Sequence, residues 1–414
     1  MHGYYDTLET REPGERERAL MAALPAQIGH AQKNAPAFAR ILDGIDPREI
    51  ASRRALAQLP VTRKSDLMER QRASPPFGGL NATPPGRLGR IFISPGPIHD
   101  PEGAGPDYWR TARALFAAGF RAGDVIQNCF SYHFTPAASM VECGARQLGC
   151  AVIPAGTGQT DMQVQAMAAL RPAGYAGTPS FLRIIIERAI ELGADISSVD
   201  RAGVSAEALS PGLRRWLNDH GLKRALQWYG TADLGLIAYE SEAMEGMILD
   251  EGIIVELVRP GTGDPVSDGE IGEIVVTVLG TDYPLVRFAT GDLSAAMPGR
   301  SPCGRTNARI RGWMGRADQS TKVKGLFVHP SQVAEVIGRH SEILRARLVV
   351  DNAGGQDRMT LHCELREGAL AALPAQVVAE TLREVTKLRG EVQFHRPGEL
   401  PNDGRVIEDA KKYD

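Results

Sequence analysis

The segment QWYGTADLG (227–235) places an aromatic ring, a glycine, a hydroxyl and a carboxylate on a predicted turn after a strand. A hydroxyl and an acid in this arrangement can contact a phosphate and its Mg²⁺ together, because Mg²⁺ prefers oxygen ligands. Thr231 and Asp233 carry these two groups. A plain capped turn has the same composition, so both interpretations stay open on this segment alone.

Two later segments contain similar chemistry. RFATGDL (287–293) carries Asp292 at a predicted strand end, where a carboxylate can bind both hydroxyls of a ribose. GRADQSTKVKG (315–325) combines Arg316 and Asp318 with two lysines and a glycine. Taken singly, the first is typical of a β-turn and the second of a solvated charged linker. The order and spacing of all three segments together outweigh these separate interpretations.

A fourth segment, RIFISPGPIHDPEG (90–103), runs from a predicted strand into a loop rich in Gly, Ser and Pro. Glycine lets backbone N–H groups approach an anion, so the layout suggests a phosphate-binding loop. Its prolines cannot donate an N–H and its acids would repel an anion: Pro95, Pro97, Pro101, Asp100 and Glu102. On these residues alone, the segment could be a phosphate loop, the remnant of one, or only a turn.

The composition excludes several other classes of protein. The chain has 414 residues with 47 basic and 50 acidic side chains, so the charge of −3 indicates neither a nucleic-acid partner nor a membrane surface. The sequence near the start lacks the apolar core of a secretory signal, and we expect a cytoplasmic protein. The five cysteines form neither a paired framework nor a CxxC pattern, which predicts reduced and mostly buried thiols.

Periodicity divides the chain into three regions. Helical spacing covers 14–43, and Thr62 or Ser65 is positioned to cap a helix that follows. From about residue 107, strands alternate with helices, which predicts a parallel sheet covered on both faces. Residues 235–290 read as antiparallel β-structure, and from about 316 a β-α-β-β-α-β order predicts a small α+β domain. We place the boundary between residues 315 and 316, giving domains 1–315 and 316–414.

The three chemical segments lie in a longer series of motifs that resembles the adenylate-forming (AMP-binding) superfamily, in its phenylacetate–CoA ligase-like branch. The resemblance covers almost the whole chain and includes LPAQIGHAQKNAPAF, LPVTRKSDL, AVIPAGTGQTDMQVQ, YAGTPSFL, YGTADLG, DGEIGEIVVTVL, PLVRFATGD, CGRTNARIRGWMGRAD and VKGLFVHPSQVAEVI. It implies a large α/β nucleotide- and acyl-binding domain with a β-rich subdomain, followed by a small mobile α+β lid domain.

The resemblance also implies a reaction and roles for individual residues. In this family, ATP and a carboxylic acid give an acyl-adenylate, and CoA then displaces AMP to give a thioester. The implied nucleotide contacts are Ala206 and Glu207 on the adenine, Tyr229 stacked near it, Gly230 and Thr231 at the α-phosphate, Asp292 on the ribose, Arg316 at the ribose–phosphate edge and Ser94 in the phosphate loop. Asp233 would hold Mg²⁺, where most relatives have a glutamate.

Further roles follow from the same resemblance. Asp318 is the implied hinge of the lid domain, and Gly325 would lie by the pantetheine channel of CoA. The segment NCFSYHFTPAAS (128–139) falls where the family builds its acyl pocket. Tyr132, His133 and Phe134 suit an aromatic acid, with His133 placed to hydrogen-bond its carboxylate, although a core aromatic cluster would have the same composition.

Three departures from the family pattern matter. The family's phosphate loop should occupy residues 93–103, and here it has lost most of its donors, which leaves Ser94, His99 and Mg²⁺ to hold the β- and γ-phosphates. Arg405 stands where the family places its adenylation lysine, and its planar guanidinium approaches a phosphate differently from an ammonium. The branch commonly has a Cys-Pro-Cys-Gly-Arg run that is thought to bind a metal. Here it is SPCGR with Ser301 in the first cysteine position, and we predict no zinc site.

The sequence therefore predicts an AMP-forming aryl- or acyl-CoA ligase that uses ATP, Mg²⁺ and CoA. It would have a small carboxylic acid as substrate, no nucleic-acid or membrane partner, and possibly a homodimeric state. Two alternatives remain: a relative that uses a preformed acyl-adenylate or an acceptor other than CoA, and a non-catalytic protein that binds a nucleotide or an acid.

Overall fold

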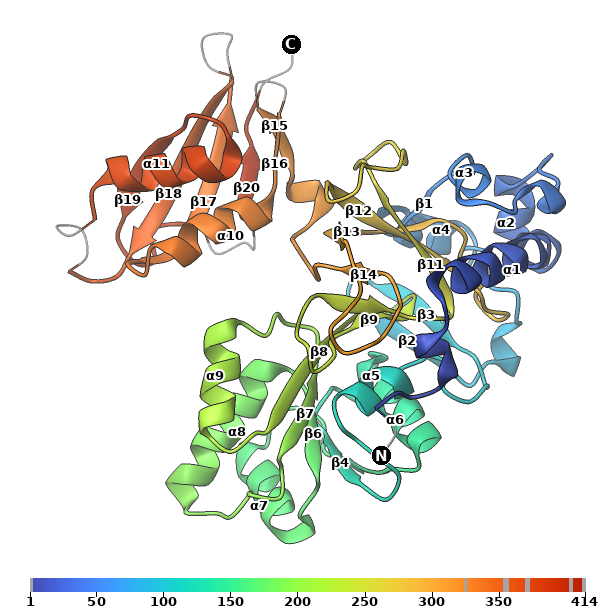
Figure 1. Cartoon of the computed structure of the whole chain (residues 1–414), viewed down its shortest axis with the longest axis horizontal. Coiled ribbons are helices and arrows are strands. Elements are labelled where there is room, and N and C mark those ends of the chain that lie inside the picture. Colours follow the sequence, from blue (N-terminus) through green and yellow to red (C-terminus); the bar gives the residue numbers. More distant parts are fainter. Residues whose placement is uncertain (1–2, 324–325, 353–356, 369–372, 402–404, 412–414) are drawn as a thin grey trace. The chain divides into compact units, whose positions relative to one another are not determined.

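The computed structural model describes residues 3–323, 326–352, 357–368, 373–401 and 405–411. The chain divides into two compact units, which we treat separately (Figure 1). Unit 1 comprises Met1–Thr290 and Ser294–Trp313, and unit 2 comprises Gly291–Leu293 and Met314–Asp414. Assigning nucleotide and acyl binding to the first domain, and a lid movement to the second, stays a prediction.

Unit 1 begins with helical segments. Helix α1 ends at Asn34 because Ala35, which precedes Pro36, has an extended backbone, and the same proline then begins α2. Ser65 donates to Asp66 and Thr62 lies in strand β1, so the predicted cap of the next helix by either residue is wrong. The elements here are α1 (Pro13–Asn34), α2 (Pro36–Ile41), α3 (Arg53–Leu56), β1 (Thr62–Arg63) and α4 (Leu67–Ala73).

The middle of unit 1 is the predicted parallel sheet, with spatial order β8-β7-β6-β4-β5. Helices α5 and α6 pack on one face and α7, α8 and α9 on the other, each with its own apolar core (Figure 1). The bounds are α5 (Ala112–Ala117), β4 (Val125–Asn128), α6 (Ala137–Leu148), β5 (Ala151–Pro154), α7 (Thr160–Leu170), β6 (Gly174–Gly177), α8 (Pro179–Leu192), β7 (Arg201–Val204), α9 (Pro211–Asp219) and β8 (Arg224–Thr231).

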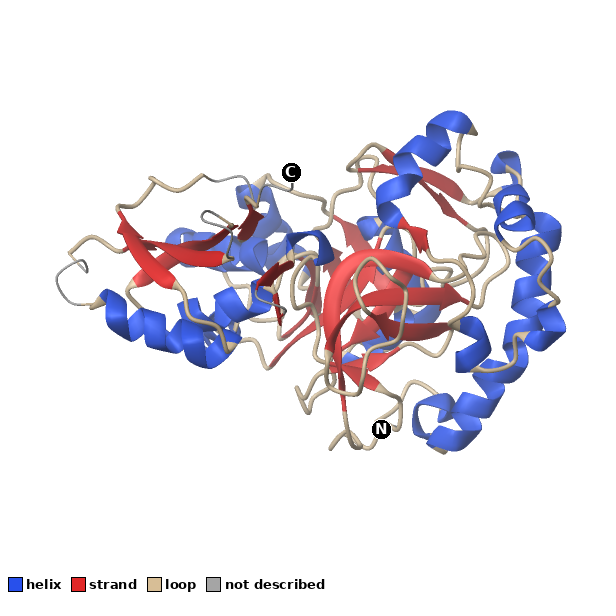
Figure 2. Ribbon diagram, turned by 90° about the horizontal axis from the view of Figure 1, so that it is seen from above, coloured by secondary structure: helices blue, strands red, loops and turns tan. Residues whose placement is uncertain are grey.

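The sheet continues beyond β8 through antiparallel strands, as predicted for residues 235–290. The order is β11-β12-β13-β14-β10-β9-β8, and β1 pairs in parallel with β13. Strands lie at the centre of unit 1 and helices around them (Figure 2). The bounds are β9 (Gly235–Tyr239), β10 (Met247–Leu249), β11 (Ile253–Val258), β12 (Ile271–Val278), β13 (Phe288–Met297) and β14 (Arg309–Ile310).

The glycine- and proline-rich segment forms a separate hairpin of β2 (Arg90–Ser94) and β3 (Ile98–Glu102). Residues 95–97 make the turn. Directly opposed residues of an antiparallel pair share a face, and Phe92 pairs with Asp100 while Ser94 pairs with Ile98. These four side chains are buried, whereas Ile91 and the other odd-numbered residues of β2 face outward.

Unit 2 has the predicted β-α-β-β-α-β order from β16 to β19, with one further strand at each end, β15 and β20. Its main sheet has the order β19-β18-β17-β20, and α10 and α11 pack against it over one apolar core. The bounds are β15 (Thr321–Val323), β16 (Leu326–Val328), α10 (Pro330–Arg339), β17 (Ile343–Asp351), β18 (Arg358–Leu365), α11 (Ala375–Thr386), β19 (Glu391–His395) and β20 (Ile407–Asp409).

The five cysteines are all free thiols and four of them are buried, which confirms the sequence-based expectation. Cys303 is half-buried and accepts a hydrogen bond from Ser301 Oγ at 3.0 Å. No helix within the described ranges is long and apolar enough to cross a bilayer.

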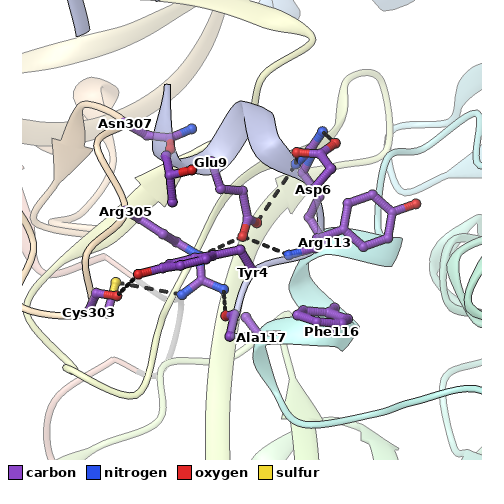
Figure 3. Close-up of polar contacts among 12 residues, drawn as sticks. Tyr4, Asp6, Glu9, Arg113, Phe116, Ala117, Cys303, Arg305 and Asn307 are labelled. Atoms are coloured by element: carbon purple, nitrogen blue, oxygen red, sulfur yellow. Dashed lines mark hydrogen bonds and ion pairs between the residues drawn. The ribbon is translucent and has the colours of Figure 1, made fainter. Parts of the chain in front are cut away.

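A buried ion-pair network joins the N-terminal segment of unit 1 to the loop before β14 (Figure 3). The Glu9 carboxylate accepts from Arg305 Nε at 3.0 Å, from the hydroxyl of Tyr239 at 2.6 Å and from the backbone N–H of Tyr5 at 3.0 Å. The side chains of Glu9 and Arg305 are 0% and 1% exposed. Both charges are therefore removed from water and depend on each other.

We expect Glu9→Ala to lower the free energy of unfolding by about 3–5 kcal/mol, because it leaves the Arg305 guanidinium buried without its carboxylate. Urea denaturation followed by circular dichroism measures this. The matched control is Glu187→Ala, which removes an exposed pair with Arg183 and should cost under about 0.5 kcal/mol. Equal effects of the two variants would contradict the prediction.

Candidate functional site

The turn between β8 and β9 carries two of the predicted site residues. Thr231 is the last residue of β8, and its hydroxyl accepts a hydrogen bond from the backbone N–H of Leu234 at 3.3 Å. Gly230 lies at a β-bulge, where an added Cβ would come within 2.4 Å of the Gly235 carbonyl oxygen. Asp233 is held in the turn with its side chain fully buried. The turn therefore has both features that the sequence left open: a side-chain cap, provided by Thr231, and an acid, Asp233, which is buried.

Asp233 is paired with a cation that the sequence analysis did not select. Lys64 Nζ, just after β1, donates to Asp233 Oδ2 at 2.5 Å. Lys64 lies in the LPVTRKSDL motif and remains partly exposed, while the carboxylate is buried. The motif was a signal for the family, but its partner is 169 positions away, and neither segment alone indicates the pair.

A second carboxylate lies beside this pair. Asp100, on the inward face of β3, is fully buried, and repulsion from Asp233 acts on it together with attraction from Lys64. Burial first, and the Asp233 charge second, raise the pKa of Asp100 to about 8. We expected Asp100 to disfavour an anion. Its position agrees with this, because the single ammonium of Lys64 lies near two carboxyl groups, those of Asp100 and Asp233.

The other residues of the predicted phosphate loop have different surroundings. Glu102 is balanced by Arg90 at 2.6 Å and accepts from Trp109 Nε1 at 2.6 Å and Ser139 Oγ at 2.5 Å. His99 is fixed by Gln71, which binds its backbone N–H, and its ring lies 3.1 Å from the Pro76 carbonyl oxygen. Glu102 is therefore a structural ion pair, and Asp100 is the acid left close to Asp233.

The predicted acyl-binding residues lie on the loop between β4 and α6. This loop contacts the hairpin, because the backbone N–H of Ile93 donates to the Phe134 carbonyl oxygen at 2.9 Å. Tyr132 is 40% exposed and Phe134 60% exposed, and His133 is exposed as well, with its ring edge-on to Phe134 at 4.6 Å between centroids. The three residues thus form an aromatic surface beside β2 and not a core cluster.

The predicted adenine contacts come from two neighbouring strand ends. Ala206 and Glu207 follow β7 and are exposed, with Ala206 at a φ of +67°, and Ser205 Oγ donates to the Trp228 carbonyl oxygen at 2.8 Å. Tyr229 is buried in the core of unit 1, and its hydroxyl lies 3.5 Å from Thr290 Oγ1. Parallel pairing of β7 with β8 brings these segments to one sheet edge.

Unit 2 holds the other predicted nucleotide contacts. Asp292 and Arg316 form an isolated β-bridge, and Arg316 Nη1 lies 3.2 Å from Asp292 Oδ1. The two residues predicted for the ribose are thus brought together. Asp318 lies in a 3₁₀ turn (Ala317–Gln319), Arg405 is exposed just before β20, and Gly325 lies outside the described residues. The roles of all these residues stay predictions.

The donors around Asp233 fit a hard divalent cation. Carboxylate and hydroxyl oxygens are the ligands of Mg²⁺, which is commonly held by one or two carboxylates together with substrate phosphates. In the part of the chain that the structure describes, no group of three or more His, Cys, Asp or Glu side chains could hold a metal ion. The absence of a zinc site stays a prediction.

Comparison of the sequence with known proteins identifies the family of this chain. The model of the AMP-binding enzyme family matches residues 108–280. The phenylacetate-coenzyme A ligase of Escherichia coli K12 is 31% identical over 383 residues, covering 88% of this chain and 86% of the relative. The enzyme of the same name from Thermus thermophilus is 28% identical over 401 residues, covering 92% and 88%.

Solved structures agree on the fold. A 2-hydroxyisobutyryl-CoA ligase in an open conformation, in complex with 2-HIB-AMP and CoA, superposes with a TM-score of 0.86 at 24% identity, covering 99% of this chain and 95% of that one. The architecture is therefore that of an adenylate-forming ligase. The chain belongs to the AMP-binding family, in its phenylacetate–CoA ligase-like branch.

The charge arrangement predicts a specific coupling between Lys64 and Asp100. Lys64→Met should lower the free energy of unfolding by about 3 kcal/mol, because it leaves Asp233 buried and unpaired beside another acid. Adding Asp100→Asn should recover at least about 1 kcal/mol, because loss of the Lys64 charge raises the pKa of Asp100 further, and Asn does not have to take up a proton when it is buried. Urea denaturation of both single variants and the double variant near neutral pH measures the coupling, and strictly additive effects would refute it.

Proposed function

We propose that this protein is an AMP-forming acyl-CoA ligase that activates a carboxylic acid with ATP and transfers the acyl group to CoA. The observation that carries the proposal is the Lys64–Asp233 ion pair on the YGTAD turn, in a chain that matches named CoA ligases over about nine tenths of its length. A buried acid with a directed ammonium can hold both a metal and a phosphate oxygen.

In the first half-reaction, a carboxylate oxygen of the acid attacks the α-phosphorus of ATP, and pyrophosphate leaves with the electrons of the broken P–O bond. Thr231 would donate its hydroxyl to the α-phosphate while accepting from Leu234, and Lys64 would neutralise a phosphate oxygen. Mg²⁺, when bound through Asp233, supplies charge stabilisation to the departing phosphates. Ala206, Glu207 and Tyr229 would orient the adenine, and Asp292 with Arg316 the ribose.

In the second half-reaction, the CoA sulfur attacks the acyl carbon, and AMP leaves with the electrons of the acyl–oxygen bond. Arg405 stands at the position that acts in the first half-reaction of the family, so the second does not require it. We assign CoA as acceptor because the relatives are named as CoA ligases. The homodimeric state and the cytoplasmic location remain predictions.

We propose an aromatic acid as substrate, because Tyr132 and Phe134 present their rings beside the hairpin that carries Ser94. In a thioester assay with ATP, Mg²⁺ and CoA, phenylacetate and benzoate should exceed hexanoate and 2-hydroxyisobutyrate by at least about tenfold in kcat/KM, equivalent to about 1.4 kcal/mol. Phe134→Ala should remove most of this preference. A faster reaction with the aliphatic acids would exclude an aromatic specificity.

Two observations favour a second candidate, a ligase that works mainly from a preformed acyl-adenylate. Asp100 is buried where the family binds phosphates, and Arg405 replaces the adenylation lysine. The two candidates differ in pyrophosphate exchange. The ATP-dependent ligase catalyses exchange between ATP and labelled pyrophosphate, whereas the second candidate makes thioester from synthetic phenylacetyl-AMP and CoA without exchange.

Arg405→Lys should raise the rate of ATP–pyrophosphate exchange by about tenfold, because an ammonium reaches the α-phosphate as a compact donor. Thioester formation from synthetic phenylacetyl-AMP should change by less than about twofold, since that step does not use the residue. The control is Lys411→Arg, which makes the reverse replacement of one cationic side chain by the other in the same tail. An equal loss in both half-reactions would show that Arg405 acts otherwise.

A further inference from the structure

The Lys64–Asp233–Asp100 cluster contains more buried negative charge than its ammonium balances. Lys64 is within hydrogen-bonding distance of one oxygen of Asp233, and Asp100 stands close enough for its charge to be repelled by Asp233. Both acids are at least nine tenths buried. An uncompensated carboxylate in such a place is costly, so a proton or a cation must accompany it.

We propose that Asp100 and Asp233 together bind a divalent cation of the Mg²⁺ class in the absence of nucleotide. The proposal deepens the proposed function, since Asp233 is the acid assigned there to the nucleotide-bound metal. The new elements are Asp100 as a second carboxylate ligand and a cation that is in place before ATP arrives.

Buried oxygens surround this position. Ser94 Oγ, both oxygens of Asp100, Asp233 Oδ1 and the hydroxyl of Tyr283 have no hydrogen bond to a group outside the cluster among the residues that the structure describes, and within the cluster Ser94 and Asp233 interact with the Asp100 carboxyl. Ser94 is 6% exposed and shares the inward face of the hairpin with Asp100. The Tyr283 side chain is buried as well, and the charges of both acids act on its hydroxyl together with its burial.

Buried polar atoms are nearly always satisfied, so several buried oxygens at one point with no partner outside their own cluster indicate a missing ligand. All five atoms are oxygens, and three of them belong to the two carboxylates, which is the donor set of Mg²⁺ and Mn²⁺ and not of an anion. Lys64 engages Asp233 Oδ2 and leaves Oδ1 available, so the ion pair and a metal bond can coexist.

The hairpin explains why this chain would need such a cation. Its turn at residues 95–97 contains two prolines, which supply no N–H to a phosphate. Glu102 is already held by Arg90 and Trp109 and does not contribute charge to the site. A cation on Asp100 would convert a surface that repels phosphate into one that attracts it.

The test is Mn²⁺ binding to the nucleotide-free, full-length protein, followed by the electron paramagnetic resonance signal of free Mn²⁺. We expect one saturable site per chain that Mg²⁺ competes for. Asp100→Asn should weaken it by at least about tenfold and Ser94→Ala by about threefold. Asp107→Asn, which removes a partly buried acid with a raised pKa outside the cluster, is the control and should leave binding within about twofold.

Absence of saturable Mn²⁺ binding to the unsubstituted protein would overturn the proposal and assign the balancing charge to a proton. Equal binding by Asp100→Asn and the unsubstituted protein would also overturn it. Should Asp100→Asn fail to fold, Ser94→Ala and the unsubstituted protein still decide the question. Because the assay contains no ATP, acid or CoA, an inactive enzyme that binds Mn²⁺ would refute the proposed function and leave this proposal standing.

Discussion

Two buried carboxylates approach each other at the inner end of a hairpin, and the elements around them are arranged to make that tolerable. Lys64 reaches Asp233 from the short strand β1, which is itself fixed by parallel pairing with β13. The hairpin presents Asp100 from the other side through the alternation of β3. Lys64, Asp233 and Asp100 come from three segments that are distant in sequence. Their charges must therefore balance one another where these segments meet, next to the turn between β8 and β9.

The same need for charge balance limits which groups of the β2–β3 hairpin can bind a ligand. A chain segment with two prolines in its turn and an acid on its inward face cannot act through backbone donors, as a glycine-rich loop does. It can act through the groups it positions, namely Ser94 and Asp100. The segment was predicted as a phosphate loop, but the polar groups on its inward face are a hydroxyl and a carboxylate.

The fold was predictable from the sequence and the charge arrangement was not. Alternating strands and helices over 107–231 require a parallel sheet, and the β-rich and α+β regions followed from local periodicity. Asp292 and Arg316 were also found from motifs, and they do lie together. Local patterns do not show pairs formed across long separations, so the Lys64 partnership and the unbalanced charge on Asp100 required the structure.

The Glu9–Arg305 pair joins residues 296 positions apart. Closing so long a segment of chain costs conformational entropy that only later contacts can offset. On the ribosome, Glu9 emerges early and its partner near the end of unit 1, so nearly all of that unit must be synthesised before the contact forms. The ion pair therefore cannot stabilise unit 1 before Arg305 has been synthesised, whatever part of the sheet has formed by then.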